Sequence, residues 1–215
     1  MKKVDQMLRN LQIAKDAGAD GVFLINHSPS KIPYMKLLEL HAIAVSNFPG
    51  WWIGVNCLDL SSVNSFRYLN DSVDGVWVDN GGIDENNDSQ VVAERVLAAR
   101  KKSNWDGMYF GGVSFKYQRR VSEHSRAACI AKDYMDVVTT SGSATGQSAP
   151  EEKVSMMKSV MGDTPLALAS GVTPENVGKY LPYVDIFIVA TGISKGFYEL
   201  DRVKVEKLVK EIKNY

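Results

Sequence analysis

Two stretches near the C-terminal end decide the fold: LALASGVTPEN (residues 166–176) and VDIFIVATGISK (residues 184–195). Each contains a short, continuous apolar run, which is typical of a fully buried parallel strand. The runs end in Ser170-Gly171 and in Thr191-Gly192. A glycine at a strand end lets the backbone turn tightly and approach a ligand. The same glycines are also compatible with plain turns between a strand and a helix.

The residues between these two strands strengthen the interpretation as an anion site. Thr173 precedes Pro174, so we expect Thr173 to cap a helix that begins at Pro174 and runs to Tyr180. Backbone N–H groups at a helix start and at glycine turns bind anions. Such a pair of strand ends is the layout of the phosphate site after the last two strands of a TIM barrel.

Working outward, the rest of the chain alternates helical and strand patterns about every 20–32 residues, which is consistent with repeated βαβ units. Asp or Asp-Gly precedes several strands, and we assign these aspartates to turns rather than to chemistry. The expected helices cover residues 2–17, 33–45, 62–69, 90–102, 121–134, 150–161, 174–180 and 202–212, and the expected strands cover residues 22–25, 52–55, 76–78, 108–110, 137–138, 166–168 and 186–189.

This alternation predicts an α/β fold of the TIM (β/α)8 type, formed by one domain over residues 1–215. An open doubly wound sheet gives the same alternation. The barrel is favoured because the units are regular and because the glycine ends occur on the last two strands. A barrel needs eight strands and only seven are found. Either the first strand is missing, the barrel is completed differently, or the reading frame starts upstream.

The composition excludes several classes of function. The 25 basic and 25 acidic residues balance, and no basic block is present, so we expect no nucleic-acid partner. No apolar run is long enough for a membrane span, and no signal peptide is found. The two cysteines, Cys57 and Cys129, form no metal motif, and we expect buried thiols in a reducing, cytoplasmic environment. The pattern predicts no metal ion and no cofactor.

Polar residues follow the expected strands, where a barrel places its chemistry. Asp79 is a carboxylate directly at a strand end and is a candidate general base or metal ligand, or else a cap of the next loop. Lys116 is a candidate for pairing with a phosphate or a carboxylate, or for forming a Schiff base, or else a solvated loop lysine. His27 is a candidate acid or base, or else a loop histidine bonded to backbone.

Further rim residues are expected to bind the ligand. Asn56 and Thr140 would orient a substrate, and the turn after residues 137–138 could form a second backbone site for an anion. We place His41 and His124 on helices away from the rim. The expected ligand- and phosphate-binding residues are Asn56, Thr140, Ser141, Gly142, Ser170, Gly171, Thr191 and Gly192.

The run DVVTTSGSATG (residues 136–146), with SGVTPENV (170–177) and IVATGISK (188–195), resembles the BtpA family of TIM-barrel proteins. The resemblance extends from about Lys3 to the C-terminus and is most specific in the last third. It implies a β/α barrel without specifying a reaction. The family's first strand and its following loop have no counterpart in this chain. Three further departures are that Ile25-Asn26 replaces Glu-Asn, Gly111 or Gly112 replaces Asp, and Lys116-Tyr117 replaces Lys-His.

Two functions therefore remain open. The first is an enzyme, an isomerase, lyase or transferase, acting on a small phosphorylated sugar or nucleotide-like metabolite. The second is a non-catalytic, degenerate barrel that binds a ligand or a partner, or assists assembly. The missing strand favours the second function, because an open barrel exposes apolar surface and sheet edges. We expect another copy of the chain to cover that surface, which predicts a homo-oligomer.

Overall fold

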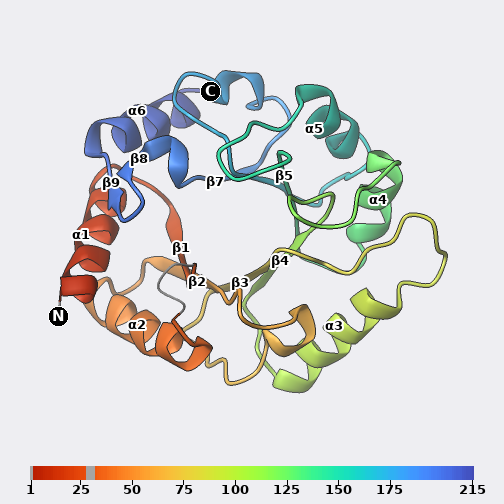
Figure 1. The fold of residues 1–215 in the computed structure, drawn as a ribbon, viewed down its shortest axis with the longest axis horizontal. Coiled ribbons are helices and arrows are strands. Elements are labelled where there is room, and N and C mark those ends of the chain that lie inside the picture. The colour runs from red at the N-terminus through yellow and green to blue at the C-terminus, as the bar shows by residue number, and fades with distance from the viewer. Residues whose placement is uncertain (1, 28–31) are drawn as a thin grey trace.

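The computed structural model describes residues 2–27 and 32–215. Within them, seven parallel strands form one curled sheet in the order β1-β2-β3-β4-β5-β6-β7, so every strand pairs with its neighbour in sequence. The helices form an outer ring around these strands (Figure 1). This is a TIM-type β/α barrel that lacks one strand, as the sequence predicted.

The elements follow one another as helix, then strand. The strands of the barrel are β1 (Gly21–Ile25), β2 (Trp52–Asn56), β3 (Gly75–Val78), β4 (Met108–Gly112), β5 (Val137–Ser141), β6 (Leu166–Ala169) and β7 (Ile186–Ile188). The α-helices are α1 (Lys2–Asp16), α2 (Tyr34–Asn47), α3 (Val91–Ser103), α4 (His124–Ala131), α5 (Glu151–Lys158) and α6 (Arg202–Lys213).

Two of the expected helices are wrong. Residues 62–69 contain only the 3-10 turn η1 (Ser62–Asn64), and residues 174–180 contain only η2 (Val177–Lys179). The Asn176 side chain accepts a hydrogen bond from the Thr173 amide at 2.8 Å, and the Thr173 hydroxyl accepts one from the Glu175 amide at 3.2 Å. These local bonds satisfy the backbone in a turn, which competes with a helix.

The sequence prediction also missed structure after β7. A third 3-10 turn, η3 (Thr191–Ile193), leads into a small hairpin of β8 (Ser194–Gly196) and β9 (Glu199–Leu200). The hairpin lies beside α1 in Figure 1. The Asn10 side chain of α1 fixes it, because Asn10 donates to the Tyr198 carbonyl at 2.8 Å and accepts from the Leu200 amide at 3.2 Å.

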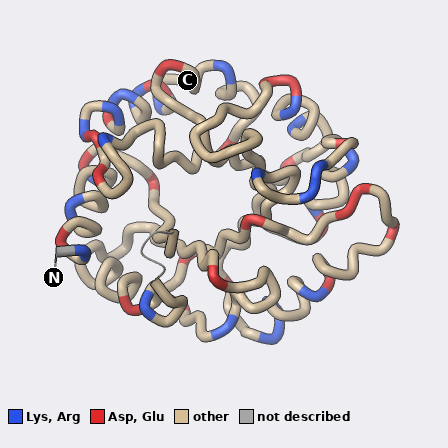
Figure 2. The backbone as a smooth tube through the Cα atoms, viewed as in Figure 1, with Lys and Arg blue, Asp and Glu red and all other residues tan. Residues whose placement is uncertain are grey.

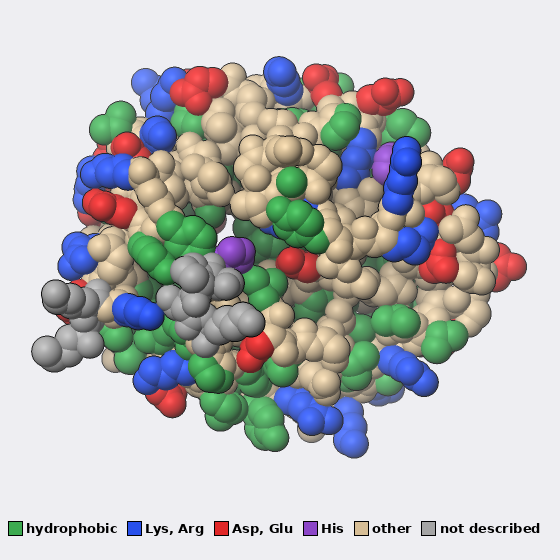
Figure 3. Space-filling view, viewed as in Figure 1, with side chains coloured by type: hydrophobic (Ala, Val, Ile, Leu, Met, Phe, Trp, Pro, Cys, Tyr) green, Lys and Arg blue, Asp and Glu red, His purple; other side chains and the backbone are tan. Residues whose placement is uncertain are grey.

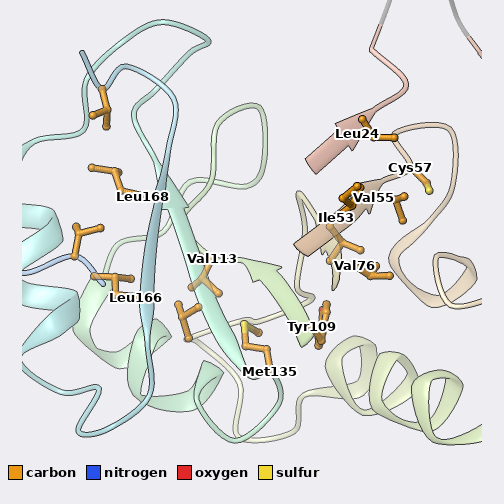
Figure 4. Close-up of a cluster of buried hydrophobic side chains, with 14 of the residues drawn as sticks. Leu24, Ile53, Val55, Cys57, Val76, Tyr109, Val113, Met135, Leu166 and Leu168 are labelled. Atoms are coloured by element: carbon orange, nitrogen blue, oxygen red, sulfur yellow. The ribbon is translucent and has the colours of Figure 1, made fainter. Parts of the chain in front are cut away.

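Side chains alternate between two hydrophobic layers, because successive residues of a strand face opposite sides of the sheet. One set, which includes Ile53, Val55, Leu166 and Leu168, packs between the sheet and the helices (Figure 4). A separate set fills the barrel interior with aromatic rings: Phe23 contacts Trp52, Trp77 and Phe110 edge to face at 5.0–5.7 Å between ring centroids. The interior is thus a packed core beneath the mouth of the barrel.

The aspartates that precede the strands are structural, as predicted. Asp74 accepts a hydrogen bond from the Ile53 amide at 2.7 Å, Asp136 from the Tyr109 amide at 2.6 Å, and Asp185 from the Leu166 amide at 2.8 Å. Each carboxylate joins the start of its own strand to the start of the preceding one. This contact fixes the parallel register at the end of the barrel opposite the mouth.

The barrel is open between its two terminal strands. Within the described residues, β1 and β7 each pair with a single strand, and Figure 1 shows them on either side of the opening. Their side chains are less buried than those of the central strands, and Ile25 is 36% exposed. The two cysteines also differ, because Cys57 is buried whereas Cys129 is exposed, contrary to our expectation for the latter.

Candidate active site

Asp79 follows β3 directly and is partly buried at the mouth of the barrel. Asn56, the last residue of β2, donates a hydrogen bond from Nδ2 to Asp79 Oδ1 at 3.1 Å. Burial raises the pKa of the Asp79 carboxyl, and the Asn56 bond and the charges of Lys116 and His27 oppose this rise. These three groups therefore surround one carboxylate, so the structure brings together four of the residues selected from the sequence.

Lys116 lies in the loop after β4 and reaches across to the end of β6. Its Nζ donates a hydrogen bond to Ser170 Oγ at 2.7 Å, and it lies 5.6 Å from the centroid of the Phe115 ring. Burial lowers the pKa of Lys116, and the charge of Asp79 opposes this shift. Lys116 is thus held between the candidate base and the turn predicted to bind phosphate.

The turn after β6 combines backbone strain with close packing. Ser170 and Gly171 have φ values of 68° and 71°, a region that is costly for a residue with a side chain. A Cβ on Gly171 would lie 2.2 Å from the Gln147 carbonyl oxygen, and a Cβ on Gly142 would meet the same atom at 2.2 Å. Both glycines therefore let the loop after β5 pack against this turn.

Backbone donors are available at the same turn. Among the described residues, the amides of Gly171 and Val172 donate to no backbone or side-chain acceptor, although the Ser170 amide donates to Ile188 at 3.4 Å. Gly192 lies against this turn, because a Cβ there would come 1.9 Å from the Val172 carbonyl oxygen. Two free amides beside a lysine can bind an anion.

The predicted helix start contributes no helix dipole to this site. Thr173 begins a turn, and the only helical residues that follow are the three of η2. Thr191 is exposed and begins the equally short η3. The anion-binding capacity therefore comes from individual N–H groups and from Lys116.

His27 is exposed at the end of β1, and its ring lies 5.5 Å from that of Phe197 at the tip of the β8–β9 hairpin. This places His27 on the side of the mouth that borders the open edge. The other two histidines differ. His41 is buried and bonded to the Ile53 carbonyl at 2.9 Å, whereas His124 begins α4 at the mouth and bonds Ser114 Oγ at 3.0 Å, not away from the rim as expected.

The two threonines of β5 have different environments. Thr140 is buried and donates to the Ser114 carbonyl at 3.3 Å. Thr139 faces the barrel interior with Val137, and its hydroxyl has no partner among the described residues. The indole N–H of Trp77, also in the interior, is likewise unpaired there. The sequence prediction selected Thr140 to orient a substrate, but successive side chains of a strand face opposite sides, and it is Thr139 that faces the interior.

Several features bound the chemistry of the site. No cluster of three or more histidine, cysteine or acidic side chains that could hold a metal occurs within residues 2–27 and 32–215. In the same residues, no helix has the length and apolar character needed to cross a bilayer. Charges of both signs are scattered around the outer ring (Figure 2).

The mouth itself is hollowed. In the view of Figure 3, a depression near the centre of the face is bordered by hydrophobic side chains, a histidine and an acidic side chain. A pocket of about 390 Å³ is lined by residues that include Asn56 and Asp79. A small ligand in this pocket can therefore contact Asp79.

Solved structures with the same fold resemble the chain over nearly its whole length. Phosphoribosyl anthranilate isomerase from Thermus thermophilus is 15% identical, with a TM-score of 0.66, and the match covers 96% of this chain and 94% of that one. (S)-3-O-geranylgeranylglyceryl phosphate synthase from Thermoplasma acidophilum, in complex with its substrate sn-glycerol-1-phosphate, is 13% identical, with a TM-score of 0.65 and coverages of 98% and 88%. A native KDPGal structure is 15% identical, with a TM-score of 0.68 and coverages of 98% and 89%. Likeness at these identities establishes the fold alone.

Sequence comparison identifies the family. No curated protein matches the chain. The family model of BtpA matches residues 52–214, which include β2 to α6 and every candidate site residue except His27. The chain belongs to the BtpA family.

Proposed function

We propose that the mouth of the barrel binds a small phosphorylated metabolite and that the protein is an enzyme. The observation that carries this proposal is the hydrogen bond from Lys116 Nζ to Ser170 Oγ at 2.7 Å, beside the free amides of Gly171 and Val172. A lysine and unpaired backbone N–H groups at one turn are complementary to a phosphate. The proposed phosphate-binding residues are Lys116, Ser170, Gly171, Thr191 and Gly192, with Ser141 and Gly142 on the adjoining loop.

The reacting part of the substrate would lie against Asp79. Burial raises the pKa of Asp79 and lowers the pKa of Lys116. Both pKa values therefore shift toward neutral pH, where a group is most efficient in acid–base catalysis. Asp79 would remove or return a proton, with Asn56 holding the carboxylate in place. We assign Thr139, rather than Thr140, to the orientation of the substrate, because the Thr140 hydroxyl is already bonded to Ser114. The reaction class is isomerisation, cleavage or group transfer.

The similar structures support the choice of a phosphorylated ligand. Two of them are named for phosphorylated compounds, and one is bound to sn-glycerol-1-phosphate. The proposed phosphate turn of this chain follows the last two strands of its barrel, which is where TIM barrels commonly bind phosphate. The residues of this turn and its position in the fold therefore both indicate a phosphate site at the carboxyl ends of these strands.

Binding is tested by titrating the protein with inorganic phosphate and glycerol phosphate in a calorimeter. We expect Lys116→Met to weaken binding by about tenfold or more, because a charge-assisted contact is lost. The matched control is Lys132→Met, which removes the same charge at the end of α4, remote from the mouth, where Lys132 bonds the Val160 carbonyl at 3.5 Å. Equal affinities in the wild type and Lys116→Met would contradict the phosphate site.

Catalysis is tested separately with Asp79→Asn. Once a sugar or nucleotide phosphate that binds is identified and turned over, we expect this variant to bind it and to lose roughly 10² to 10⁴ in turnover, the usual contribution of a general base. Turnover at the wild-type rate would remove Asp79 from the mechanism and would leave the phosphate site intact.

A second candidate function follows from the open edge of the barrel. Among residues 2–27 and 32–215, strands β1 and β7 pair on one edge only, and they are less buried than the strands between them. Such edges pair readily with another chain. The alternative proposal is a non-catalytic barrel in which a second copy of the chain covers this edge. Light scattering and the binding of an apolar dye test it. If the protein is a monomer at micromolar concentration and binds no dye, this candidate is contradicted.

A further inference from the structure

Lys153 is a cation placed where a helix disfavours one. It is the third residue of α5, and the amino end of a helix carries partial positive charge. The side chain is partly buried, and burial lowers its pKa to about 8. Among the described residues it forms no ion pair with a carboxylate. The helix start and the burial both disfavour a cation at this position, so the hydrogen bonds of Lys153 must offset that cost.

Those contacts reach the two loops that form the proposed phosphate site. Lys153 Nζ donates to the Ser114 carbonyl at 2.5 Å and to the Ser141 carbonyl at 2.8 Å. Ser114 lies in the loop after β4, two residues before Lys116, and Ser141 ends β5. One ammonium group therefore joins the loop that carries Lys116 to the neighbouring strand.

The loop that Lys153 holds is strained on both sides of Lys116. Ser114 has a φ of 50° and Tyr117 a φ of 60°, and each such residue costs roughly 1–3 kcal/mol unless its surroundings hold it. The Lys116 amide donates to Ser141 Oγ at 2.8 Å. Lys153 thus binds the carbonyl of the same serine whose hydroxyl fixes the backbone of Lys116.

We propose that Lys153 is a positioning residue for the phosphate site: by binding the Ser114 and Ser141 carbonyls, it holds the strained loop that directs Lys116 at Ser170. This inference rests on the proposed function. Lys153 touches no phosphate itself and acts through Lys116. The groups that face it are the two carbonyls and, on α4, His124. Burial and then the charge of Lys153 lower the pKa of His124, and the charges of Glu85 and Glu123 oppose this shift.

The test is Lys153→Met, compared with Lys116→Met, titrated with inorganic phosphate in a calorimeter. We expect Lys153→Met to weaken phosphate binding about tenfold, in the range expected for losing hydrogen bonds to a charged group. The variant loses two hydrogen bonds but also removes a partly buried cation from a helix start, and because these effects oppose each other we expect only a small change in melting temperature. The matched control is Lys158→Met on the same helix, where Lys158 pairs with Asp185 at 2.6 Å away from the site; its affinity should be unchanged.

A second readout separates positioning from a structural contact. Burial lowers the pKa of Lys116, so release of its loop to water raises that pKa toward the ordinary value. NMR titration of lysine side chains should show this rise in Lys153→Met and not in Lys158→Met. Lys153→Gln keeps a polar group at the carbonyls but cannot bridge both as a cation, and we expect it to weaken binding by at least about threefold.

The outcomes are distinct. If either Lys153 variant folds and binds phosphate as tightly as the wild type, the proposal is wrong. If Lys153→Met lowers the melting temperature and leaves both the phosphate affinity and the Lys116 pKa unchanged, Lys153 is a structural clamp only, and the proposal is equally wrong. If Lys116→Met itself binds phosphate normally, it is the proposed phosphate site that fails.

Discussion

The two sides of the barrel mouth differ in how their strands are held. On the side formed by β3 to β6, every strand is paired on both edges, and the residues of β3, β5 and β6 are all buried. On the other side, β1 and β7 end the sheet and are partly exposed. Asp79, Lys116 and Ser170 all belong to the first side, whereas His27 and Gly192 follow the edge strands. The proposed base and lysine thus lie where every strand is paired on both edges, which is what a preorganised site requires.

Truncation of the core is expected to give one of the two largest losses of stability, and the loss should differ between the two sides. Leu168 of β6 is fully buried, so Leu168→Ala should cost roughly 3 kcal/mol of unfolding free energy through lost burial and a cavity. Ile188 of β7 is only partly buried, and Ile188→Ala should cost about half as much. Urea denaturation measures both. Equal losses would mean that the edge strand is covered in solution.

The second contrast uses two glycines. Gly171 has a φ of 71°, and a Cβ there would meet the Gln147 carbonyl oxygen at 2.2 Å, so Gly171→Ala should cost about 3 kcal/mol. An added Cβ on Gly196, in the hairpin at the open edge, would meet no atom of the described residues within 4 Å. Gly196→Ala should change the unfolding free energy by less than about 0.5 kcal/mol. If Gly171→Ala also changed the unfolding free energy by less than about 0.5 kcal/mol, the turn would not be packed against the Gln147 carbonyl.

The side of the barrel formed by β3 to β6 should also make the free energy of unfolding sensitive to acid. Glu85, whose side chain is buried, binds Arg119 and accepts a hydrogen bond from the Ser122 amide at 3.0 Å. These contacts lower its pKa to about 2. A lowered pKa stabilises the fold above the ordinary glutamate pKa, and this stabilisation is lost as the pH falls from about 4.5 toward 2.

Glu85→Gln tests this effect. Because Arg119 is 45% exposed, we discount the interaction to about 1–2 kcal/mol, and the wild type should lose that much more stability than the variant between pH 7 and pH 3. The control is Asp16→Asn at the exposed Asp16–Arg202 pair beside the open edge, which should have little effect. Parallel pH profiles for wild type and Glu85→Gln would refute the assignment.

The smallest individual effects are expected within a single strand, where two neighbouring threonines should differ in sign. The Thr139 hydroxyl is buried and unpaired, so Thr139→Val should stabilise the protein by about 1 kcal/mol. The Thr140 hydroxyl donates to Ser114, so Thr140→Val should cost about 1 kcal/mol. If both variants are destabilised, the Thr139 hydroxyl has a partner in solution and is a weaker candidate for substrate binding.

The sequence by itself determined the β/α repeat, the seven strands, the end of the barrel that carries polar residues, and the family. These follow from local patterns: apolar runs make buried parallel strands, and residues at strand ends share one face of the fold. The same patterns failed at residues 62–69 and 174–180, where side chains that bond the local backbone, such as Asn176, replace a helix with a turn.

Only the tertiary structure decided how the site residues meet. The contact of Lys116 with Ser170 joins residues 54 positions apart, and the contacts of Lys153 with Ser114 and Ser141 depend on how α5 packs against two strand ends. The inward face of Thr139 and the bonded state of Thr140 depend on strand orientation. Such contacts depend on packing between distant segments, which no local pattern in the chain encodes, because a pattern sets periodicity and not which partners meet.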